Sequence, residues 1–324
     1  MRLPFLVVEK KDFDAVGFGL NAVDHLIVVP GYPAFDTKVR FTQYEKSAGG
    51  QTASAMVALQ RLGLTTAYAG RFGADEDGRF GLMSLEYEGV DLQYAETIEG
   101  ADNQVAFIII DSQSGERTII WDRDERLSYR PDEAPIELAA CGRVLHLDAH
   151  DPPACAAMAR AARSAGSIVT VDVDNIYDRL PELLPLVDVL ITSSEFPRRL
   201  TGISNKRDSL IEIKSRYGCA IVGATLGAQG ALVYTEGQFI ESPAFAVPGG
   251  CRDTTGAGDA FHAGFIYGML NAWELETCLK LGNAVAALKC RALGARAALP
   301  TADELTEFVA RAVIASSFAG KDLS

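Results

Sequence analysis

The stretch Asp253-Thr254-Thr255-Gly256-Ala257-Gly258-Asp259 runs directly into the apolar segment Ala260-Phe261-His262-Ala263-Gly264-Phe265-Ile266. This pattern predicts a glycine-rich turn that opens a helix over residues 258–270. The start of a helix presents unpaired backbone N–H groups and the positive end of the peptide dipoles, which together form an anion site. Glycines in the turn let a ligand approach the backbone more closely than a side chain would allow. The stretch therefore predicts an anion-binding loop.

Asp259 stands in the first turn of that helix, where a carboxylate repels the anion that the loop would hold. The conflict disappears if Asp259 is a base that takes a proton from a hydroxyl attacking a phosphoryl group. An ordinary aspartate, with a pKa of about 3.9, is ionised at neutral pH, so we expect no unusual pKa shift to be needed. The alternative is a simple helix cap, because aspartate is common at helix starts.

The composition is typical of a globular enzyme of one large α/β domain or two units. The chain has 324 residues, of which 48% are hydrophobic and 23% charged, so it can bury a substantial core. A formal net charge of -13 argues against a nucleic-acid partner, which needs a basic surface. Neither a signal peptide nor an apolar run long enough to span a membrane is evident. We expect a cytoplasmic protein with no membrane contact.

Strand and helix patterns alternate along almost the whole chain. Short apolar runs of this kind are typical of parallel strands buried on both faces. The alternation predicts a three-layer, doubly wound α/β domain that spans residues 1–324. The expected strands are 14–19, 65–69, 144–147, 167–172, 187–192 and 220–224, and the expected helices are 50–62, 77–87, 153–165, 204–216, 258–270, 274–291 and 301–315.

Two segments depart from this alternation. Residues 26–44 are β-like and punctuated by prolines, and residues 105–121 have the pattern of a hairpin. We expect strands from about 24–46 and 104–122 to pair into a small sheet that covers a ligand site as a lid. Such a sheet leaves edges that a second copy of the chain can cover. The sequence therefore predicts a homodimer formed through the lid.

Two common nucleotide-binding motifs are excluded. Gly17-x-Gly19-x-x-Ala22 matches a dinucleotide fingerprint, but the β-branched segment 23–30 follows it where that motif requires a helix. The chain also has no G-x-x-x-x-G-K-[ST] loop. Asp24 is expected at the end of the first strand, where α/β folds place ligand-binding groups.

The combination of motifs resembles a known family. Residues 253–261 resemble the second signature of the pfkB (ribokinase-like) carbohydrate kinases, and residues 49–81 resemble the first. The resemblance covers nearly the whole chain. It implies a ribokinase-like fold with a β-lid and the ATP-dependent phosphorylation of a sugar or similar alcohol.

The resemblance also implies roles for individual residues. Asp259 would be the catalytic base, and the amides of Gly256, Ala257 and Gly258 would form the anion hole. The residues implied at the sugar are Asp24, Gly49, Gly50, Gln51 and Ser54, and those implied at the nucleotide are Thr225, Gly227, Gly230 and Asn283.

Ketohexokinase-like enzymes are the most similar members in two further segments. Residues 31–36 resemble their lid segment, which places Asp36 at the sugar, and residues 114–119 resemble their hairpin, which places Arg117 at the nucleotide phosphates. Gln51 and Ser54 stand where asparagines are common in fructose and ribose kinases, which leaves the identity of the sugar open.

The resemblance implies two cations as well. Mg²⁺ would be bound to ATP and mostly water-coordinated, with Glu195 of Thr192-Ser193-Ser194-Glu195 as an outer-shell partner. Asp253 and Thr255 would help to hold a monovalent cation such as K⁺ behind the anion hole. Alternatively, both residues only shape the turn.

Two other functions remain open. A nucleoside kinase on the same fold would need aromatic side chains to stack on a base, and Phe35, Phe107 and Trp121 are candidates. A catalytically silent sugar-binding or regulatory module is the second alternative, against which the intact Asp259 argues.

Overall fold

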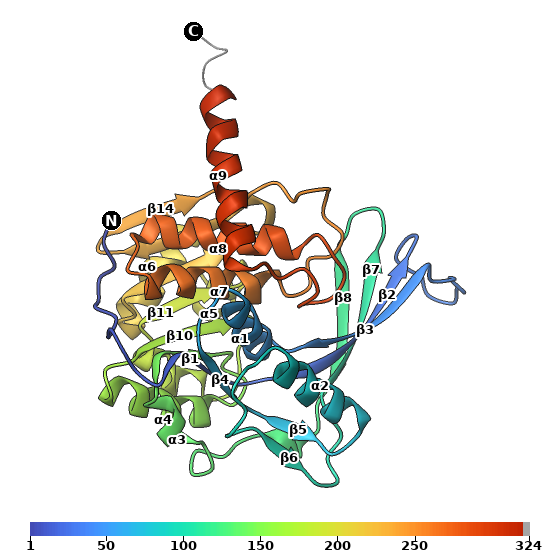
Figure 1. The fold of residues 1–324 in the computed structure, drawn as a ribbon, viewed down its shortest axis with the longest axis horizontal. Coiled ribbons are helices and arrows are strands. Elements are labelled where there is room, and N and C mark those ends of the chain that lie inside the picture. The colour runs from blue at the N-terminus through green and yellow to red at the C-terminus, as the bar shows by residue number, and fades with distance from the viewer. Residues whose placement is uncertain (320–324) are drawn as a thin grey trace.

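The computed structural model describes residues 1–319, and an eight-stranded sheet lies at its centre (Figure 1). Six strands run parallel, and the last two, β13 and β14, are antiparallel. The spatial order is β14-β13-β12-β11-β10-β9-β1-β4. The strands are β1 (Phe13–Phe18), β4 (Thr66–Ala69), β9 (Gly142–Leu147), β10 (Ile168–Val173), β11 (Val189–Thr192), β12 (Ile221–Thr225), β13 (Ala231–Thr235) and β14 (Gln238–Ser242).

Helices cover both faces of this sheet and give three layers. One hydrophobic core joins the sheet to α1, α7, α8 and α9, and a second joins its other face to α3, α4, α5 and α6. Every residue of β4, β10 and β11 is buried, as expected for strands covered on both sides. The helices are α1 (Gln51–Arg61), α2 (Glu76–Tyr87), α3 (Ile136–Ala139), α4 (Pro152–Ser164), α5 (Phe196–Thr201), α6 (Lys206–Tyr217), α7 (Ala257–Leu270), α8 (Leu275–Lys289) and α9 (Ala302–Ala319).

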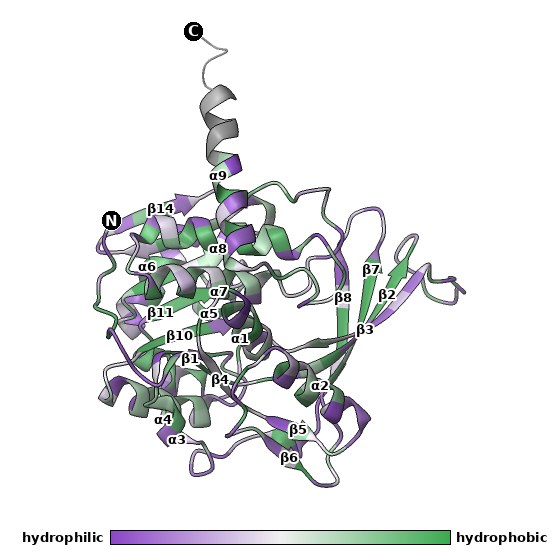
Figure 2. Ribbon diagram, viewed as in Figure 1, coloured by the Kyte–Doolittle hydropathy of each residue, from purple (hydrophilic) through white to green (hydrophobic). Residues whose placement is uncertain are grey.

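A separate four-stranded sheet, which we call the lid, projects from one side of the body (Figure 1). Its order is β3-β2-β7-β8, with β2 (Ala22–Val29), β3 (Gln43–Gly49), β7 (Val105–Asp111) and β8 (Arg117–Asp122). Residues of β7 alternate in burial, and Figure 2 shows apolar residues along β2 and β7. One face of the lid packs on Leu293 through Leu26, Ala106 and Ile108. Strands β5 (Arg71–Gly73) and β6 (Glu96–Ile98) form a small parallel pair nearby.

The predicted fold class is confirmed: a mostly parallel three-layer α/β domain carries a smaller separate sheet. One placement was wrong. Asp24 does not lie at the end of the first strand, which stops at Phe18, but inside β2, where it pairs with Ala106 of β7. The β-branched segment that excludes a dinucleotide fold is thus the first lid strand. Among the described residues, no helix has both the length and the apolar character needed to span a bilayer.

Candidate active site

A cavity of about 1050 Å³ lies between the carboxyl edge of the parallel sheet and the inner face of the lid. Ligands of open α/β sheets bind at this edge because the loops that follow the strands converge there. The cavity brings together residues that the sequence places far apart. The predicted site residues on its wall are Asp24, Gly50, Gln51, Arg117, Thr225, Gly227, Gly230, Thr255, Gly256, Ala257, Gly258, Asp259 and Asn283.

The floor of the cavity is the loop that opens α7. Gly256 has a left-handed backbone with φ 75°, and a Cβ atom there would lie 2.7 Å from the Cβ of Ala295. Only glycine satisfies both constraints. The amide of Ala257 donates to the carbonyl oxygen of Thr254 at 3.1 Å. The amides of Gly256 and Gly258 have no acceptor among the described residues, so they are the two donors of the predicted anion hole that stay free.

Asp259 is the third residue of α7 and lies on the cavity wall, partly exposed. Burial raises its pKa well above the ordinary value, and the neighbouring carboxylates Asp172 and Asp24 raise it further. The positive charges of Arg117 and Lys289 oppose this shift. The sequence required no pKa shift for Asp259 to act as a base, and the fold produces one through burial and the neighbouring carboxylates. A raised pKa makes the ionised Asp259 carboxylate a stronger base. It also lowers the fraction of the free enzyme in which Asp259 is ionised.

Asp24 lies beside the floor, with its side chain almost fully buried. Burial raises its pKa to about 7, although the guanidinium of Arg296 opposes the shift. A Cβ atom on Gly49 would lie 2.3 Å from the Asp24 carboxylate. Gly49 therefore contributes the space that Asp24 occupies, and it does not line the cavity itself.

Arg296 is buried behind the part of the cavity wall that contains Asp24, and it holds this part in place through hydrogen bonds. The sequence analysis did not identify it. Its guanidinium donates to the carbonyl oxygen of Gly49 at 2.5 Å, to Ser54 Oγ at 3.2 Å and to Ser84 Oγ at 2.8 Å. Ser54 is buried and does not line the cavity. The structure thus places two residues expected at the sugar, Gly49 and Ser54, behind the wall. A buried arginine with three oxygen partners has no sequence motif that would have found it.

The sequence analysis also missed a buried group of three side chains, Asp172, His262 and His146, next to Gly258. Asp172, at the carboxyl end of β10, lies 3.3 Å from Nε2 of His262 and lines the cavity. Burial opposes its ionisation, but His262 and a hydrogen bond with Gln51 lower its pKa below the ordinary value. The rings of His262 and His146 lie 5.3 Å apart. His262 stands three residues after Asp259 in the motif, and this helical spacing was the available signal.

The other end of the cavity has an apolar wall of residues 244–247, with Ala286 and Ala287 of α8. The side-chain amide of Asn283 donates to the carbonyl oxygens of Ser242 (3.0 Å) and Pro243 (3.2 Å) and so holds the start of this wall. A Cβ atom on Gly230 would lie 2.0 Å from the Ser242 carbonyl oxygen. Thr225 and Gly227 complete this end, which has the apolar surface that a flat heterocycle needs.

Besides Gly49 and Ser54, the predicted residues Asp36 and Glu195 do not line the cavity. Asp36 is exposed, with φ 59°, in the loop between β2 and β3. Glu195 is exposed and pairs with Arg198 at 3.0 Å. Ser193 is the residue of that segment that reaches the cavity. A contact of Asp36 with a ligand requires movement of its loop, and both roles remain predictions.

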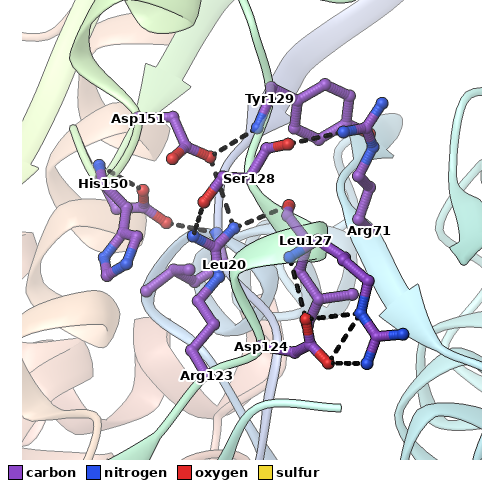
Figure 3. Close-up of polar contacts among 12 residues, drawn as sticks. Leu20, Arg71, Arg123, Asp124, Leu127, Ser128, Tyr129, His150 and Asp151 are labelled. Carbon is purple, nitrogen blue, oxygen red and sulfur yellow. Dashed lines mark hydrogen bonds and ion pairs between the residues drawn. The ribbon is translucent and has the colours of Figure 1, made fainter. Parts of the chain in front are cut away.

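A polar network holds the root of the lid beside the cavity (Figure 3). Just beyond β8, the guanidinium of Arg123 donates to the Leu127 carbonyl oxygen (2.9 Å), to Ser128 Oγ (3.0 Å) and to Asp151 Oδ2 (3.3 Å). The same Asp151 oxygen accepts the amide of Tyr129 at 3.1 Å. These bonds tie the end of β8 to the start of α4. They position Trp121, whose ring lies 6.0 Å from that of His150 at the cavity wall.

The residues expected at a monovalent cation lie directly behind the floor. Asp253 is completely buried, and its carboxylate accepts the amides of Thr255 and Gly294, each at 2.8 Å. The ammonium of Lys289 lies 3.7 Å from Asp253 Oδ2. Thr255 Oγ1 is buried without a hydrogen-bond partner among the described residues.

Comparison with known proteins identifies the family of the chain. A family model described as pfkB family carbohydrate kinase matches residues 14–302. An ATP-dependent ribose-1-phosphate kinase of Halopiger xanaduensis is 31% identical, over 88% of this chain and 94% of its own length. A nucleoside kinase of Methanothermobacter thermautotrophicus is 26% identical, over 93% and 97%. The structure of Arabidopsis thaliana ribokinase complexed with ribose and ATP superposes with a TM-score of 0.77, at 22% identity, over 92% and 98%.

Proposed function

This chain belongs to the pfkB family of carbohydrate kinases, and on that premise we propose that it transfers the γ-phosphoryl group of ATP to a hydroxyl of a small, uncharged, ketose-like sugar. The observation that carries the proposal is the position of Asp259. It lines the same cavity as the apolar residues 244–247 and the carboxylates Asp24 and Asp172, and it follows Gly258, which has one of the two free backbone amides.

Each end of the cavity suits one substrate. Residues 244–247 and α8 offer an apolar slot for the adenine, and Arg117 lies on the lid above Thr254, to which it donates a hydrogen bond. Arg117 can therefore reach phosphates that lie over the floor. Asp24, Gln51 and Asp172 line the other end and offer hydrogen-bond acceptors to sugar hydroxyls.

In this arrangement the acceptor hydroxyl lies next to the Asp259 carboxylate, which takes its proton as the oxygen attacks the γ-phosphorus. The bond from that phosphorus to the bridging oxygen breaks, and ADP leaves with the electron pair. The amides of Gly256 and Gly258 stabilise the charge on the phosphoryl oxygens. Positioning and charge stabilisation supply most of the rate in such reactions.

Mg²⁺ is expected to accompany ATP. No group of three or more acidic, histidine or cysteine side chains forms a metal cluster in the described part of the chain. This fits an ion that is bound mainly by phosphates and water. When bound, Mg²⁺ neutralises phosphate charge. We propose that Glu195 is its outer-shell partner after release from Arg198.

The charges of the acidic end favour a neutral acceptor. Asp24, Asp172 and Asp174 all line it, whereas the guanidinium of Arg199 is held by the Asp174 carbonyl oxygen and by Asn175. A phosphate group on the acceptor would meet these three carboxylates, while both terminal nitrogens of Arg199 already donate hydrogen bonds to Asp174 and Asn175. A polyhydroxylated, uncharged sugar avoids this repulsion.

A nucleoside is the second candidate, because one aromatic wall is available. Trp121, His150 and Tyr177 line the cavity together, and the rings of His150 and Tyr177 lie 4.9 Å apart. Phe35 and Phe107, the other aromatic candidates, do not line the cavity. Phe107 stacks on His25 on the outer face of the lid.

We further propose a homodimer through that outer face. Tyr44, Phe107 and Ile120 are large exposed side chains on it, and all residues of the edge strand β8 are exposed. Exposed apolar surface on an open sheet edge is typical of a subunit interface. Sedimentation equilibrium should give twice the mass of the chain, and a monomer at micromolar concentration would refute the dimer.

The experiment that tests the function is ADP release with Mg-ATP across ketoses, aldoses, sugar phosphates and nucleosides. We expect the highest kcat/KM with one neutral ketose. A preference for a nucleoside would indicate that the acceptor binds at the aromatic wall of Trp121, His150 and Tyr177. If no compound in the panel led to ADP release although ATP still bound, the result would favour the regulatory alternative and refute the proposal.

A further inference from the structure

Lys289, at the end of α8, is a completely buried lysine directly behind the cavity floor. Its ammonium donates to the carbonyl oxygen of Asp253 at 3.0 Å and lies 3.7 Å from Oδ2 of the same residue. Lysines are almost never fully buried unless they are paired, because desolvation of the charge is costly. The location of this lysine therefore needs an explanation.

Asp253 is the partner, and it connects three segments. Its Oδ1 accepts the amide of Thr255, which precedes Gly256, and its Oδ2 accepts the amide of Gly294. Gly294 adjoins Ala295, whose Cβ is the atom that Gly256 must avoid. The Asp253–Lys289 pair thus fixes the loop that aims the free amides of the anion hole.

These residues do not fit the monovalent cation that the sequence led us to expect. Both carboxylate oxygens of Asp253 already accept backbone amides, and the ammonium faces one of them. A cation bound to Asp253 would share that carboxylate with the Lys289 ammonium, and two positive charges held so close together repel each other. Thr255 Oγ1 is the unpartnered oxygen nearby, and one neutral hydroxyl does not offset that repulsion.

We propose that the Lys289 ammonium is a built-in cation that holds the anion-hole loop, so that this kinase needs no K⁺. Lys289 is a positioning residue: it touches Asp253, and the substrates contact the loop. The inference rests on the kinase function proposed above.

The electrostatic field of Lys289 also reaches the catalytic groups. Burial and the carboxylates of Asp172 and Asp24 raise the pKa of Asp259, and the charge of Lys289 acts in the opposite direction. If Lys289 had only a structural role, its removal would change the stability of the protein alone. If its charge holds the anion-hole loop, its removal should also change kcat and the dependence of kcat on pH.

The first test is the rate of the wild-type enzyme in K⁺, Na⁺ and tetramethylammonium salts at one ionic strength. We expect rates within about twofold of one another. The melting temperature should also be equal in the three salts. A saturable, K⁺-specific activation of more than about threefold, or a K⁺-specific rise in melting temperature, would overturn the proposal. The melting experiment needs no acceptor, so it tests the cation requirement even if no substrate is found.

The second test removes the charge. Lys289→Ala should lower kcat by about tenfold or more in tetramethylammonium salt, with smaller changes in both KM values. K⁺ or ethylammonium should restore part of the activity, because either can enter the space beside Asp253. Lys280→Ala is the matched control on the same helix, since Lys280 is only partly buried, and should keep the wild-type rate.

Wild-type kcat in the K⁺-free Lys289→Ala enzyme would refute the role of Lys289. If that variant does not fold, Lys289→Met with Asp253→Asn removes both buried charges together. The double variant should fold yet keep the tenfold loss of kcat, and a wild-type rate would overturn the proposal.

Discussion

The floor and the lid of the cavity are built in opposite ways. Asp253 and Lys289 behind the floor are completely buried and hydrogen-bonded, and position 256 admits only glycine because of its φ and because a Cβ there would lie 2.7 Å from the Cβ of Ala295. The lid is a single sheet layer, its edge strand β8 is exposed throughout, and Trp121 is 52% exposed. A floor of this kind can present amides and a base in one fixed geometry, and a thin lid can adjust to the acceptor.

This difference predicts that changes in the floor lower kcat and changes in the lid raise KM. Gly256→Ala should have the largest effect. The loop holds position 256 in a left-handed conformation, which costs a residue with a Cβ about 1–2 kcal/mol, and the added methyl group would lie 2.7 Å from the Cβ of Ala295. A displacement of the free amides by about 1 Å should lower kcat about 100-fold. Steady-state kinetics and thermal melting measure both effects.

Gly237→Ala is the control for the cost of placing alanine in a left-handed backbone conformation. Gly237 has φ 79° in the turn between β13 and β14, with no atom within 4 Å of a Cβ at that position. This variant should lose stability but not activity. Equal losses of kcat in the two variants would mean that the floor is not held as tightly as proposed.

Asp24→Asn tests the junction of floor and lid, because Asp24 belongs to a lid strand but lies beside the floor. Loss of a charged hydrogen-bond acceptor should raise the acceptor KM about 10- to 100-fold. Burial raises the pKa of Asp24 to about 7. Its protonated fraction therefore grows as the pH falls through 7, and kcat/KM for the acceptor should fall on that side.

In Asp24→Asn, kcat/KM for the acceptor should still fall at low pH, because Asp259 must be ionised. The midpoint of this fall should lie at a lower pH than in the wild type, because the Asp24 charge raises the pKa of Asp259. Profiles from about pH 5.5 to about pH 8.5 cover the range in which such raised carboxyl groups titrate. The exposed Asp178 provides the control variant Asp178→Asn, which should match the wild type. An unchanged midpoint in Asp24→Asn would exclude Asp24 as a titrating contact.

Trp121→Ala should have the smallest effect. Removal of an aromatic contact from the lid is expected to raise the acceptor KM about 3- to 10-fold, with kcat nearly unchanged. Thr118→Ala, on the opposite face of β8, should leave both parameters as they are. A large fall in kcat for Trp121→Ala would show that the lid shares in the fixed geometry of the floor.

The floor was more predictable from the sequence than its supports. The Asp253–Asp259 loop is contiguous, and a glycine-rich turn before an apolar helix has few other interpretations. Arg296, Lys289 and Asp172 act across long sequence separations, so no local pattern announces them. Asp259 was recognised, but the direction of its pKa shift follows from burial and from neighbouring carboxylates that only the fold brings together.

The lid shows the same limit. A β-like segment over residues 26–44 and a hairpin pattern over residues 105–121 predicted its strands, and β7 and β8 form that hairpin. The sequence placed the start of the first lid strand at about residue 24, and β2 begins two residues earlier, at Ala22. The position of Asp36 depends on an irregular loop between β2 and β3, for which no periodic pattern exists.

The proposed mechanism depends above all on Asp259 as the base of phosphoryl transfer. Single-turnover transfer of the γ-phosphoryl group by Asp259→Asn, beside the wild type, isolates this role when ATP affinity is measured on the same samples. We predict a transfer rate about 10²–10⁴-fold lower and an ATP Kd within about threefold of the wild type. Transfer at the wild-type rate by the Asn variant would contradict the assignment of Asp259 as the base.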